Sequence, residues 1–462
     1  MKPKKKPTKK LSGHNTLLES LLKYVFATLI IFIPLYPKFP LFNIPGTYVA
    51  VRSEDFILVL LAFLLLAHFL KNPLFFFRFT MTRSIFIFWL VGLIAIISGI
   101  FLTKTIPFHL GMLHWARRIE YMLPFFAGII LVRNHRNLIF FLKLIPLVAL
   151  SVFAYGIAQL YFNAPVISTQ NVEFSKGIAL TLQPGVNLSS TFAGHYDLAT
   201  YLTMTIALFA GLLAVPKKNL FRFLGVIFLL VLFWLQLRTG SRIAFGATII
   251  TVSLVFYLAK KPLWIIPVFF IAVIGLINTP SISGRFNSLI DVYRHNLEQK
   301  VKGVFDNRAF IVKSIYAQEE TPTPTKPPEN LRPIQQDRST SIRFDVEWPR
   351  ALRALSKNPF LGTGYGSISL ATDNDYLRAL GETGLLGFLA LITVFINLLA
   401  GLIRGIKHKL PSLEHHFLLG SLSLFLSFLM IATFIDVFEA SKVATLFWMY
   451  TGLAYGLTLN QS

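Results

Sequence analysis

Residues 84–102 read SIFIFWLVGLIAIISGIFL, an apolar stretch without a single charged side chain. A run of about 20 such residues is long enough to cross the hydrocarbon core of a bilayer as a helix. Comparable runs recur along the chain, which is 54% hydrophobic and only 14% charged. Because the runs are continuous rather than alternating, they favour spanning helices over a barrel of strands. The sequence therefore predicts an all-α polytopic membrane protein.

Outward from this stretch, we expect about twelve spanning helices. Residues 1–16 form a basic tail, residues 17–278 hold the first nine helices, residues 279–384 form one large loop, and residues 385–462 hold the last three helices. The expected spans cover residues 17–35, 56–70, 84–102, 119–132, 138–162, 192–215, 221–237, 243–259, 263–278, 385–403, 417–434 and 443–459.

The basic residues between the apolar runs predict the orientation of the chain. Loops rich in lysine and arginine stay on the cytoplasmic side of a membrane. Both termini are therefore expected in the cytoplasm, and residues 163–191 and 279–384 outside the inner membrane. The net charge of +23 then indicates contact with anionic membrane lipid rather than with nucleic acid. The even-numbered connections carry Lys71, Arg78 and Arg83; Arg133 and Arg136; Lys217, Lys218 and Arg222; Lys260 and Lys261; and Arg404, Lys407 and Lys409.

The large loop is far longer than an ordinary connection, which indicates a function. Within it, residues 321–328 read TPTPTKPP and cannot hold regular hydrogen-bonded structure, so we expect a mobile insertion. The chain has no cysteine, which excludes disulfides, zinc–thiolate sites and a thiol nucleophile.

A first polar cluster at the expected outer face is RTGSR, from Arg238 to Arg242. Two guanidinium groups beside a Gly-Ser turn and a helix start suit a pyrophosphate group. The alternative is that both arginines only reach the lipid headgroups.

A second cluster is SSTFAGHYD at residues 189–197, where His195 and Asp197 could orient a sugar or a water molecule. The alternative is a helix cap at Ser190 or Thr191. A third cluster holds Arg117, Arg118 and Glu120 at the start of the fourth span. We expect an ion pair between Arg117 and Glu120, which leaves the role of Arg118 open.

The fourth cluster lies just before the tenth span. It contains the glycine-rich segment PFLGTGYG at residues 359–366, the triplet Asp373-Asn374-Asp375, and Gly384 and Gly387. Glycines let a backbone approach a ligand or turn sharply. The carboxylates could activate an acceptor hydroxyl or bind sugar hydroxyls. The alternative is a glycine turn followed by a helix cap at Asp373 or Asp375.

In their order along the chain, these pieces resemble the O-antigen ligase and O-antigen polymerase (Wzy-type) superfamily of bacterial membrane glycan transferases. PFLGTGYG is similar to the family's Pro-x-x-Gly-x-Gly-x-Gly segment. Asp373-Asn374, nine residues and Gly384-Leu-Leu-Gly387 resemble the family's His-Asn, nine residues and Gly-x-x-Gly. The Thr-Gly-Ser-Arg segment ending at Arg242, and Ser-Thr-Phe before His195, also resemble family segments.

The resemblance implies a GT-C-like helical fold and an undecaprenyl-pyrophosphate-linked glycan as the donor. It also implies that arginines hold the donor pyrophosphate and that the motif histidine activates the acceptor. This chain has Asp373 at the place of that histidine. An aspartate is ionised at neutral pH and can accept a proton, but it cannot become a cation that complements pyrophosphate. Ligation, polymerisation and transfer to another surface acceptor therefore all stay open.

Our hypothesis is glycan transfer to a glycan or lipid-linked acceptor, without a metal or any other cofactor. Asp373 and Asn374 are the expected catalytic residues. A secondary transporter or a lipid-linked glycan flippase is the alternative, and it draws on the carboxylates of Asp436 and Glu439. The expected pyrophosphate ligands are Arg242, Arg238 and Arg343, and the expected substrate contacts are His195, Asp197, Arg118, Gly364, Tyr365 and Asp375.

Overall fold

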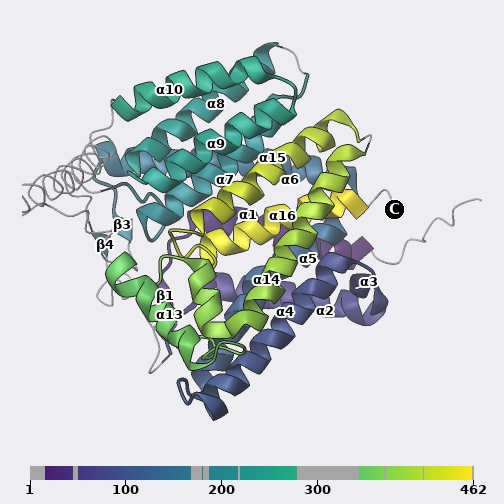
Figure 1. The fold of residues 1–462 in the computed structure, drawn as a ribbon. Helices are drawn as coiled ribbons and strands as arrows, with labels where there is room; N and C mark the ends of the chain where they lie inside the picture. Colours follow the sequence, from purple (N-terminus) through teal and green to yellow (C-terminus); the bar gives the residue numbers. More distant parts are fainter. Residues whose placement is uncertain are drawn as a thin grey trace, which may run out of the picture.

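The structure, a computed structural model, describes residues 16–44, 50–167, 179–180, 187–216, 219–277, 343–368, 371–408 and 410–459. The expected basic tail up to residue 15, the insertion at residues 321–328, Lys217, Lys218 and Lys409 lie outside the described residues. Long helices dominate the described part and lie side by side in one bundle (Figure 1).

Every expected span overlaps one long helix. These helices are α1 (Thr16–Leu35), α2 (Ser53–Lys71), α4 (Thr80–Ile97), α5 (Phe108–Leu131), α6 (His135–Tyr161), α7 (His195–Leu213), α8 (Asn219–Arg238), α9 (Arg242–Leu258), α10 (Ile265–Ile277), α14 (Asp375–Lys407), α15 (Ser412–Ile431) and α16 (Ser441–Leu459). The shorter elements are α3 (Leu74–Phe77), the π-helices η1 (Ser98–Leu102) and η4 (Arg343–Glu347), the 3-10 helix η3 (Pro262–Trp264), α13 (Trp348–Lys357), and the antiparallel pairs β1 (Pro40–Asn43) with β2 (Ala50–Arg52) and β3 (Val166–Ile167) with β4 (Ala179–Leu180).

The lengths and composition of these helices show a polytopic membrane protein. Within the described ranges, eight helices are long and apolar enough to cross a membrane, and α9 and η3–α10 are shorter apolar helices. Helices α5 and α16 are not among these, although both lie inside the bundle. The protein is therefore all-α and multi-pass, while the count of twelve crossings stays a prediction.

Small residues let the central helices approach closely. A Cβ atom added to Gly128 of α5 would lie 2.7 Å from the carbonyl carbon of Gly452 in α16. A Cβ atom added to Gly211 of α7 would lie 2.6 Å from the backbone nitrogen of Gly420 in α15. Glycine-lined crossings of this kind are a general means of packing helices within a membrane. The pairs α5–α16 and α7–α15 thus form the core of the bundle.

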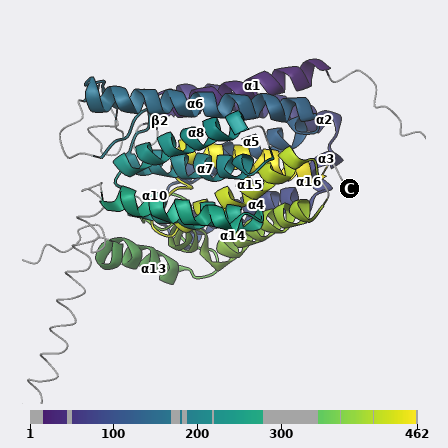
Figure 2. The same cartoon turned by 90° about the horizontal axis from the view of Figure 1, so that it is seen from above.

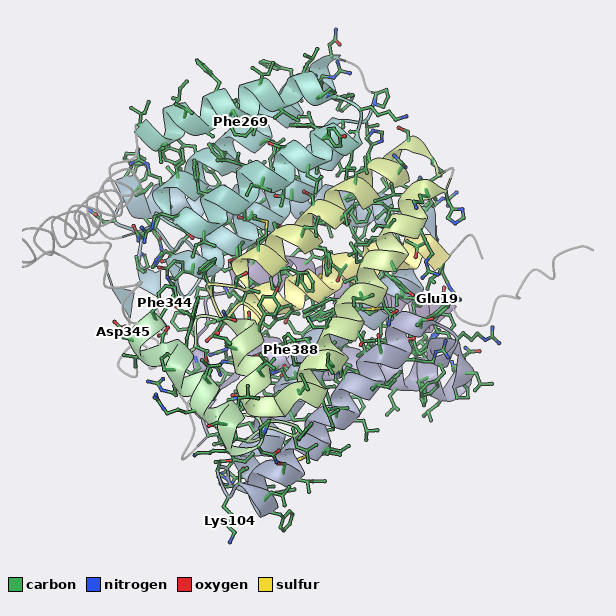
Figure 3. All side chains as sticks on the ribbon, in the orientation of Figure 1. Glu19, Lys104, Phe269, Phe344, Asp345 and Phe388 are labelled. Atoms are coloured by element: carbon green, nitrogen blue, oxygen red, sulfur yellow. The ribbon has the colours of Figure 1, made fainter. Side chains whose placement is uncertain are left out.

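The ends of the helices place the polar clusters at one end of the bundle. Figure 3 shows Glu19, in the first turn of α1, at the end opposite to Phe344 and Asp345 of η4. The end of α16 lies at the same end of the bundle as the start of α1 (Figure 1). In the perpendicular view, α1 and α6 form one side of the bundle and α13 lies outermost on the other (Figure 2). Residues 343–368 and 371–375 are therefore held at the end that lies away from the start of α1 and the end of α16.

Three helix starts differ from the sequence-based expectation. Helix α5 begins at Phe108, so Arg117, Arg118 and Glu120 lie inside it rather than at its start. Helix α7 is capped by Gly194 and not by a hydroxyl of the preceding segment. Helix α14 is capped by the Asn374 side chain, which accepts from the Leu377 amide. The cap of α14 is thus local, and it comes from the asparagine between the two aspartates that the sequence offers as caps.

Candidate functional site

The central feature of the site is an ion pair between Arg343 and Asp373. Arg343 is the first residue of η4, and only 7% of its surface is exposed. Its Nη2 and Nε atoms lie 2.8 Å and 3.0 Å from the Oδ2 atom of Asp373. The Asp373 side chain is 29% exposed. Because both nitrogens contact one oxygen, the Oδ1 atom is left for another hydrogen-bond donor.

The charge state of Asp373 reflects burial and its neighbours. Burial raises the pKa of the Asp373 carboxyl, while the Arg343 guanidinium acts in the opposite direction. A carboxylate with a raised pKa is a stronger base than an exposed aspartate. Asp373 is therefore suited to accepting a proton.

The backbone at Asp373 is in an unusual conformation that its neighbours hold. Its φ angle is +50°, in the left-handed region that non-glycine residues seldom adopt. The amides on either side, of Thr372 and Asn374, donate to the two carboxylate oxygens of Asp436 at 2.7 Å and 3.1 Å. Asp436 lies in the connection between α15 and α16. One carboxylate from a distant connection thus holds the backbone amides of the residues before and after Asp373, and strain held in this way is typical of functional sites.

Asp375, two residues after Asp373, is bonded to the same connection. Its carboxylate accepts from the Phe438 amide at 3.1 Å, and its own amide donates to the Ala432 carbonyl at 3.0 Å. The Asp375 side chain is buried. The residues before α14 therefore form one rigid unit with the α15–α16 connection.

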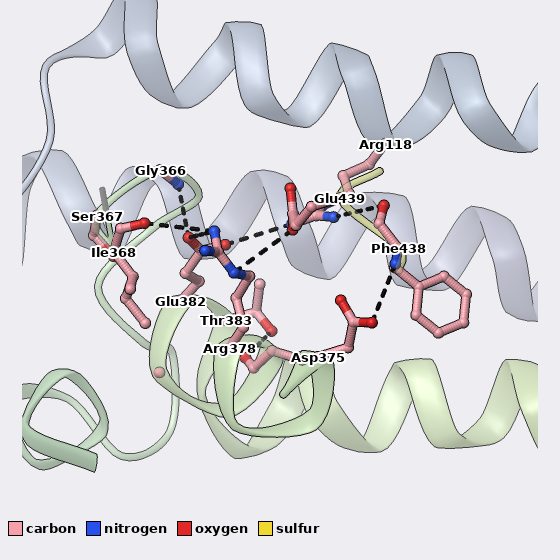
Figure 4. Close-up of polar contacts among 12 residues, drawn as sticks. Arg118, Gly366, Ser367, Ile368, Asp375, Arg378, Glu382, Thr383, Phe438 and Glu439 are labelled. Carbon is pink, nitrogen blue, oxygen red and sulfur yellow. Dashed lines mark hydrogen bonds and ion pairs between the residues drawn. The ribbon is translucent and has the colours of Figure 1, made fainter. Parts of the chain in front are cut away.

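A network of buried charges lies beneath this unit (Figure 4). The Arg378 guanidinium lies 3.3 Å from the Asp436 carboxylate and 3.5 Å from that of Glu382. Arg118 pairs with Glu439 and lies 3.6 Å from Glu382. Each arginine contacts two carboxylates, and each of the three carboxylates contacts an arginine. Every charge in the network therefore has a partner of opposite sign, which buried charges require.

Arg118 and Tyr365 also line a small cavity within this network. The Arg118 guanidinium lies 5.2 Å from the centre of the Tyr365 ring, an arrangement that stabilises a cation. The cavity has a volume of about 40 Å³ and is also lined by Asp375, Arg378 and Glu439. This space suits ordered water rather than a sugar.

The glycine-rich segment wraps around a break in α14. Gly384 has φ +64° and ψ −171°, which are not helical angles, and it separates the first turns of α14 from the long apolar part. The amides of Thr363 and Gly364 donate to the carbonyls of Gly381 and Glu382 at 3.2 Å and 2.7 Å. A Cβ atom added to Gly362 would lie 2.4 Å from the Gly384 nitrogen. These glycines permit contact between two backbones, and the substrate contacts expected for Gly364 and Tyr365 stay predictions.

The two arginines of the RTGSR segment occupy the turn between α8 and α9. Arg238 is exposed and lies over the Trp234 ring at 5.0 Å, and Arg242 is the first residue of α9. The Ser241 hydroxyl caps α9 by accepting from the Ala244 amide. This turn lies at the same end of the bundle as η4 (Figure 1). The structure therefore brings Arg343 directly to Asp373 and places Arg238 and Arg242 at the same end.

His195 and Asp197 belong to a second cluster at this end. Asp197 pairs with Lys38 at 3.6 Å, and burial lowers the pKa of Lys38 although Asp197 raises it. His195 is the first residue of α7. Nearby, the buried Lys442 of α16 donates to the Thr191 carbonyl at 2.8 Å. The segment before α7 is thereby joined to α16.

The ion pair expected on α5 is confirmed. Arg117 lies 3.0 Å from Glu120 and pairs also with Asp55 of α2 at 2.7 Å.

Within the described ranges, no group of three or more His, Asp or Glu side chains is arranged to hold a metal ion.

Several residues of the site were not selected from the sequence. Arg378 and Glu382 stand four residues apart in α14, a spacing that places charged residues on one helix face and could have indicated them. Lys38 and Lys442 follow or precede apolar runs and look like ordinary interfacial lysines. Asp436 was noted only as a carboxylate that favours a transporter. Its contacts with the segment before α14 have no local sequence signal.

A comparison with known protein families matches a segment that contains several residues of this site. Residues 227–392 match the O-antigen ligase family. The chain carries an O-antigen ligase domain. This domain includes Arg238, Arg242, Arg343, the glycine-rich segment and Asp373, whereas Arg118, His195 and Asp197 lie outside it. A search of curated proteins finds no match for the chain. The resemblance stated from the motifs is confirmed.

Proposed function

We propose that the protein transfers glycan from an undecaprenyl-pyrophosphate carrier to an acceptor hydroxyl at the outer face of the cytoplasmic membrane. The O-antigen ligase domain implies ligation of a lipid-linked glycan in surface polysaccharide biosynthesis. The observation that carries the finer proposal is the pairing of Asp373 with Arg343 inside that domain. It combines a proton acceptor with a cation that suits pyrophosphate.

In the proposed step, Asp373 is the general base. The acceptor hydroxyl donates its proton to the Oδ1 atom of Asp373, and its oxygen attacks the anomeric carbon of the donor sugar. The bond from that carbon to the pyrophosphate oxygen breaks, and the configuration at the carbon inverts. Asn374 holds the N-terminal turn of α14 in place, because its side chain accepts from the Leu377 amide. The step uses neither a metal nor a nucleotide, because pyrophosphate is already a good leaving group.

The leaving pyrophosphate carries the charge that the arginines are proposed to stabilise. A guanidinium group pairs with two phosphate oxygens at once, which makes arginine effective in this role. Arg343 stands beside the base, and Arg242 and Arg238 supply two further cations at the same end of the bundle. Their charge stabilises the transition state more than the ground state as negative charge develops on the leaving group.

The fold and its orientation support this placement. The proposed site lies at the end away from the start of α1 and the end of α16, and the basic connections favour a cytoplasmic place for those two helix ends. The site then faces the outer leaflet, as a GT-C-like glycan transferase requires. We assign substrate contacts to His195 and Asp197. Arg118, Gly364, Tyr365 and Asp375 would act beneath the substrates, by holding the segment that carries Asp373 in place.

The test is glycan transfer by purified variants supplied with a lipid-pyrophosphate donor. We expect Arg242→Ala and Asp373→Asn to lose most of the transfer rate. The matched control is Arg404→Ala, which removes an exposed arginine from the opposite end of α14. Its rate should equal that of the unchanged protein. Full transfer by a correctly inserted Arg242→Ala variant would remove the pyrophosphate role, and full transfer by Asp373→Asn would remove the base.

Surface glycans of a deletion strain distinguish the remaining reactions. An acceptor without glycan indicates a ligase, and short chains on a normal acceptor indicate a polymerase. Lipid-linked glycan that accumulates on the inner side would indicate a flippase instead. Accumulation on the outer side agrees with the proposed transfer.

A further inference from the structure

An apolar cavity lies between α7, α8, α9 and α10, away from the proposed catalytic site. Its volume is about 290 Å³, which is close to the lower limit for ligand pockets. Its walls are almost entirely aliphatic and aromatic, with Val226, Val252 and Val268 among them. The Thr248 hydroxyl in the wall is already bonded to the Ala244 carbonyl at 2.9 Å. A cavity of this composition offers water almost no partner.

The cavity lies at the edge of the bundle and not in its core. Helices α8 and α10 form the outer layer there, and both views show α10 at the surface of the bundle (Figures 1 and 2). Phe269 of α10 points outward and is 54% exposed (Figure 3). The surroundings of the cavity are therefore the hydrocarbon chains of the membrane.

Two cations stand at one end of this cavity. Arg222, in the first turn of α8, lines the cavity and lies 5.7 Å from the Trp264 ring. Lys261 lies 4.6 Å from the same ring, and its Nζ atom donates to the Ala214 carbonyl at 2.7 Å. Burial lowers the pKa of Lys261, and the nearby Arg222 lowers it further. Two like charges on one tryptophan repel each other, and an anion between them would relieve this repulsion.

The Arg222 guanidinium also has an unused donor. Its Nε atom is buried and makes no hydrogen bond to the protein. Among the residues that the structure describes, no carboxylate pairs with Arg222 or Lys261. A buried donor without an acceptor is costly, which indicates that a ligand supplies the acceptor.

We propose that this cavity binds an anionic phospholipid, with one acyl chain between the four helices and the headgroup phosphate against Arg222 and Lys261. The apolar walls suit the chain, and the two cations suit the phosphate. A free phosphate ion would leave the apolar space unfilled, and a zwitterionic lipid would gain less from the cations. The site goes beyond the proposed glycan transfer and does not rest on it.

The test is lipid retention by the purified full chain, measured by native mass spectrometry. The probes are phosphatidylglycerol, phosphatidylethanolamine with the same acyl chains, and inorganic phosphate. We expect retention of phosphatidylglycerol and about a fivefold loss in Arg222→Gln, since one cation near the membrane surface contributes on the order of that factor. The charge control is Lys260→Gln, which removes the exposed neighbour of Lys261 and should retain the lipid as before.

A second pair of variants tests the chain position. Val268→Phe fills the cavity and should weaken retention, whereas Val273→Phe adds the same bulk on the exposed face of α10 and should not. Arg222→Lys keeps the charge and should retain more lipid than Arg222→Gln. Unchanged retention in Arg222→Gln, unchanged retention in Val268→Phe, equal retention of both lipids, or displacement by inorganic phosphate would each overturn the proposal.

Discussion

Replacement of Asp436 by asparagine tests whether a residue that contacts no substrate controls the proposed base. The carboxylate of Asp436 accepts two amides, one on each side of Asp373, and also contacts Arg378. Asparagine keeps one acceptor oxygen and turns an NH2 group toward the other amide. One hydrogen bond to a charged group is then lost, at a cost of about 1.5–3 kcal/mol.

The left-handed backbone of Asp373 makes this loss matter. That conformation costs about 1–2 kcal/mol in a residue other than glycine, so it needs the hydrogen bonds that hold it. With one of these two hydrogen bonds lost, we expect the Asp373 backbone to relax and its side chain to leave its place beside the acceptor. A loss of about 2 kcal/mol of transition-state stabilisation corresponds to roughly a thirtyfold fall in rate.

The assay is glycan transfer in proteoliposomes with a purified lipid-pyrophosphate donor. We expect kcat to fall in Asp436→Asn while KM for the donor is unchanged, because Arg343 and Arg242 still hold the pyrophosphate. The control is Glu414→Gln, which removes a carboxylate paired with His135 at the other end of the bundle. Its kcat should not change.

The double variant with Asp373→Asn decides between two explanations. If Asp436 acts only by positioning Asp373, the double variant should be no slower than Asp373→Asn alone. A further thirtyfold fall in the double variant would show that Asp436 acts independently, and the reasoning would be refuted.

Three further predictions concern the neighbouring features. Gly384→Ala should lower the Tm in detergent, because a Cβ atom there would lie 2.5 Å from the Gly362 nitrogen at φ +64°; Gly246→Ala, with open space at the Cβ position, should raise the Tm slightly. Burial, Asp373 and Asp436 raise the pKa of Glu347 to about 7 in the folded protein. The free energy of unfolding should therefore fall as the pH rises from the ordinary pKa of a glutamate to about 7. Glu347→Gln should raise the Tm at pH 8 and leave it unchanged at pH 4. Arg118→Ala should lower the Tm, because it leaves the buried Glu382 with Arg378 alone and removes the close partner of the half-buried Glu439; an unchanged Tm would contradict a structural role of Arg118.

Most of the helical framework could be predicted from the sequence. Apolar runs such as residues 84–102 allow no other structure in a bilayer, because the backbone must satisfy its own hydrogen bonds there. The tenth span was expected from Leu385, directly after the break at Gly384. The sequence did not show that the residues before the break form the first turns of the same helix. The hydropathy of a segment does not depend on the backbone angles of its glycines, so it cannot report a break at Gly384.

The candidate site could be predicted only in part. Asp373 and Arg343 could be selected because they stand in segments that resemble the O-antigen ligase family. Their direct pairing could not, since thirty positions of sequence separate them. The clamp from Asp436 and the pairing of Arg118 with Glu439 are contacts between distant segments, and neither periodicity nor spacing reports such contacts.

The position of Asp436 late in the chain also determines when, during synthesis, the proposed site can be completed. Helices enter the membrane as the ribosome makes them, and the connection that holds Asp373 in place is made only after α15. A nascent chain that already displays the ligase motif still lacks the support for its backbone. The proposed site is therefore completed only in the last stage of synthesis, and we expect a chain that stops short of residue 436 to be inserted but inactive.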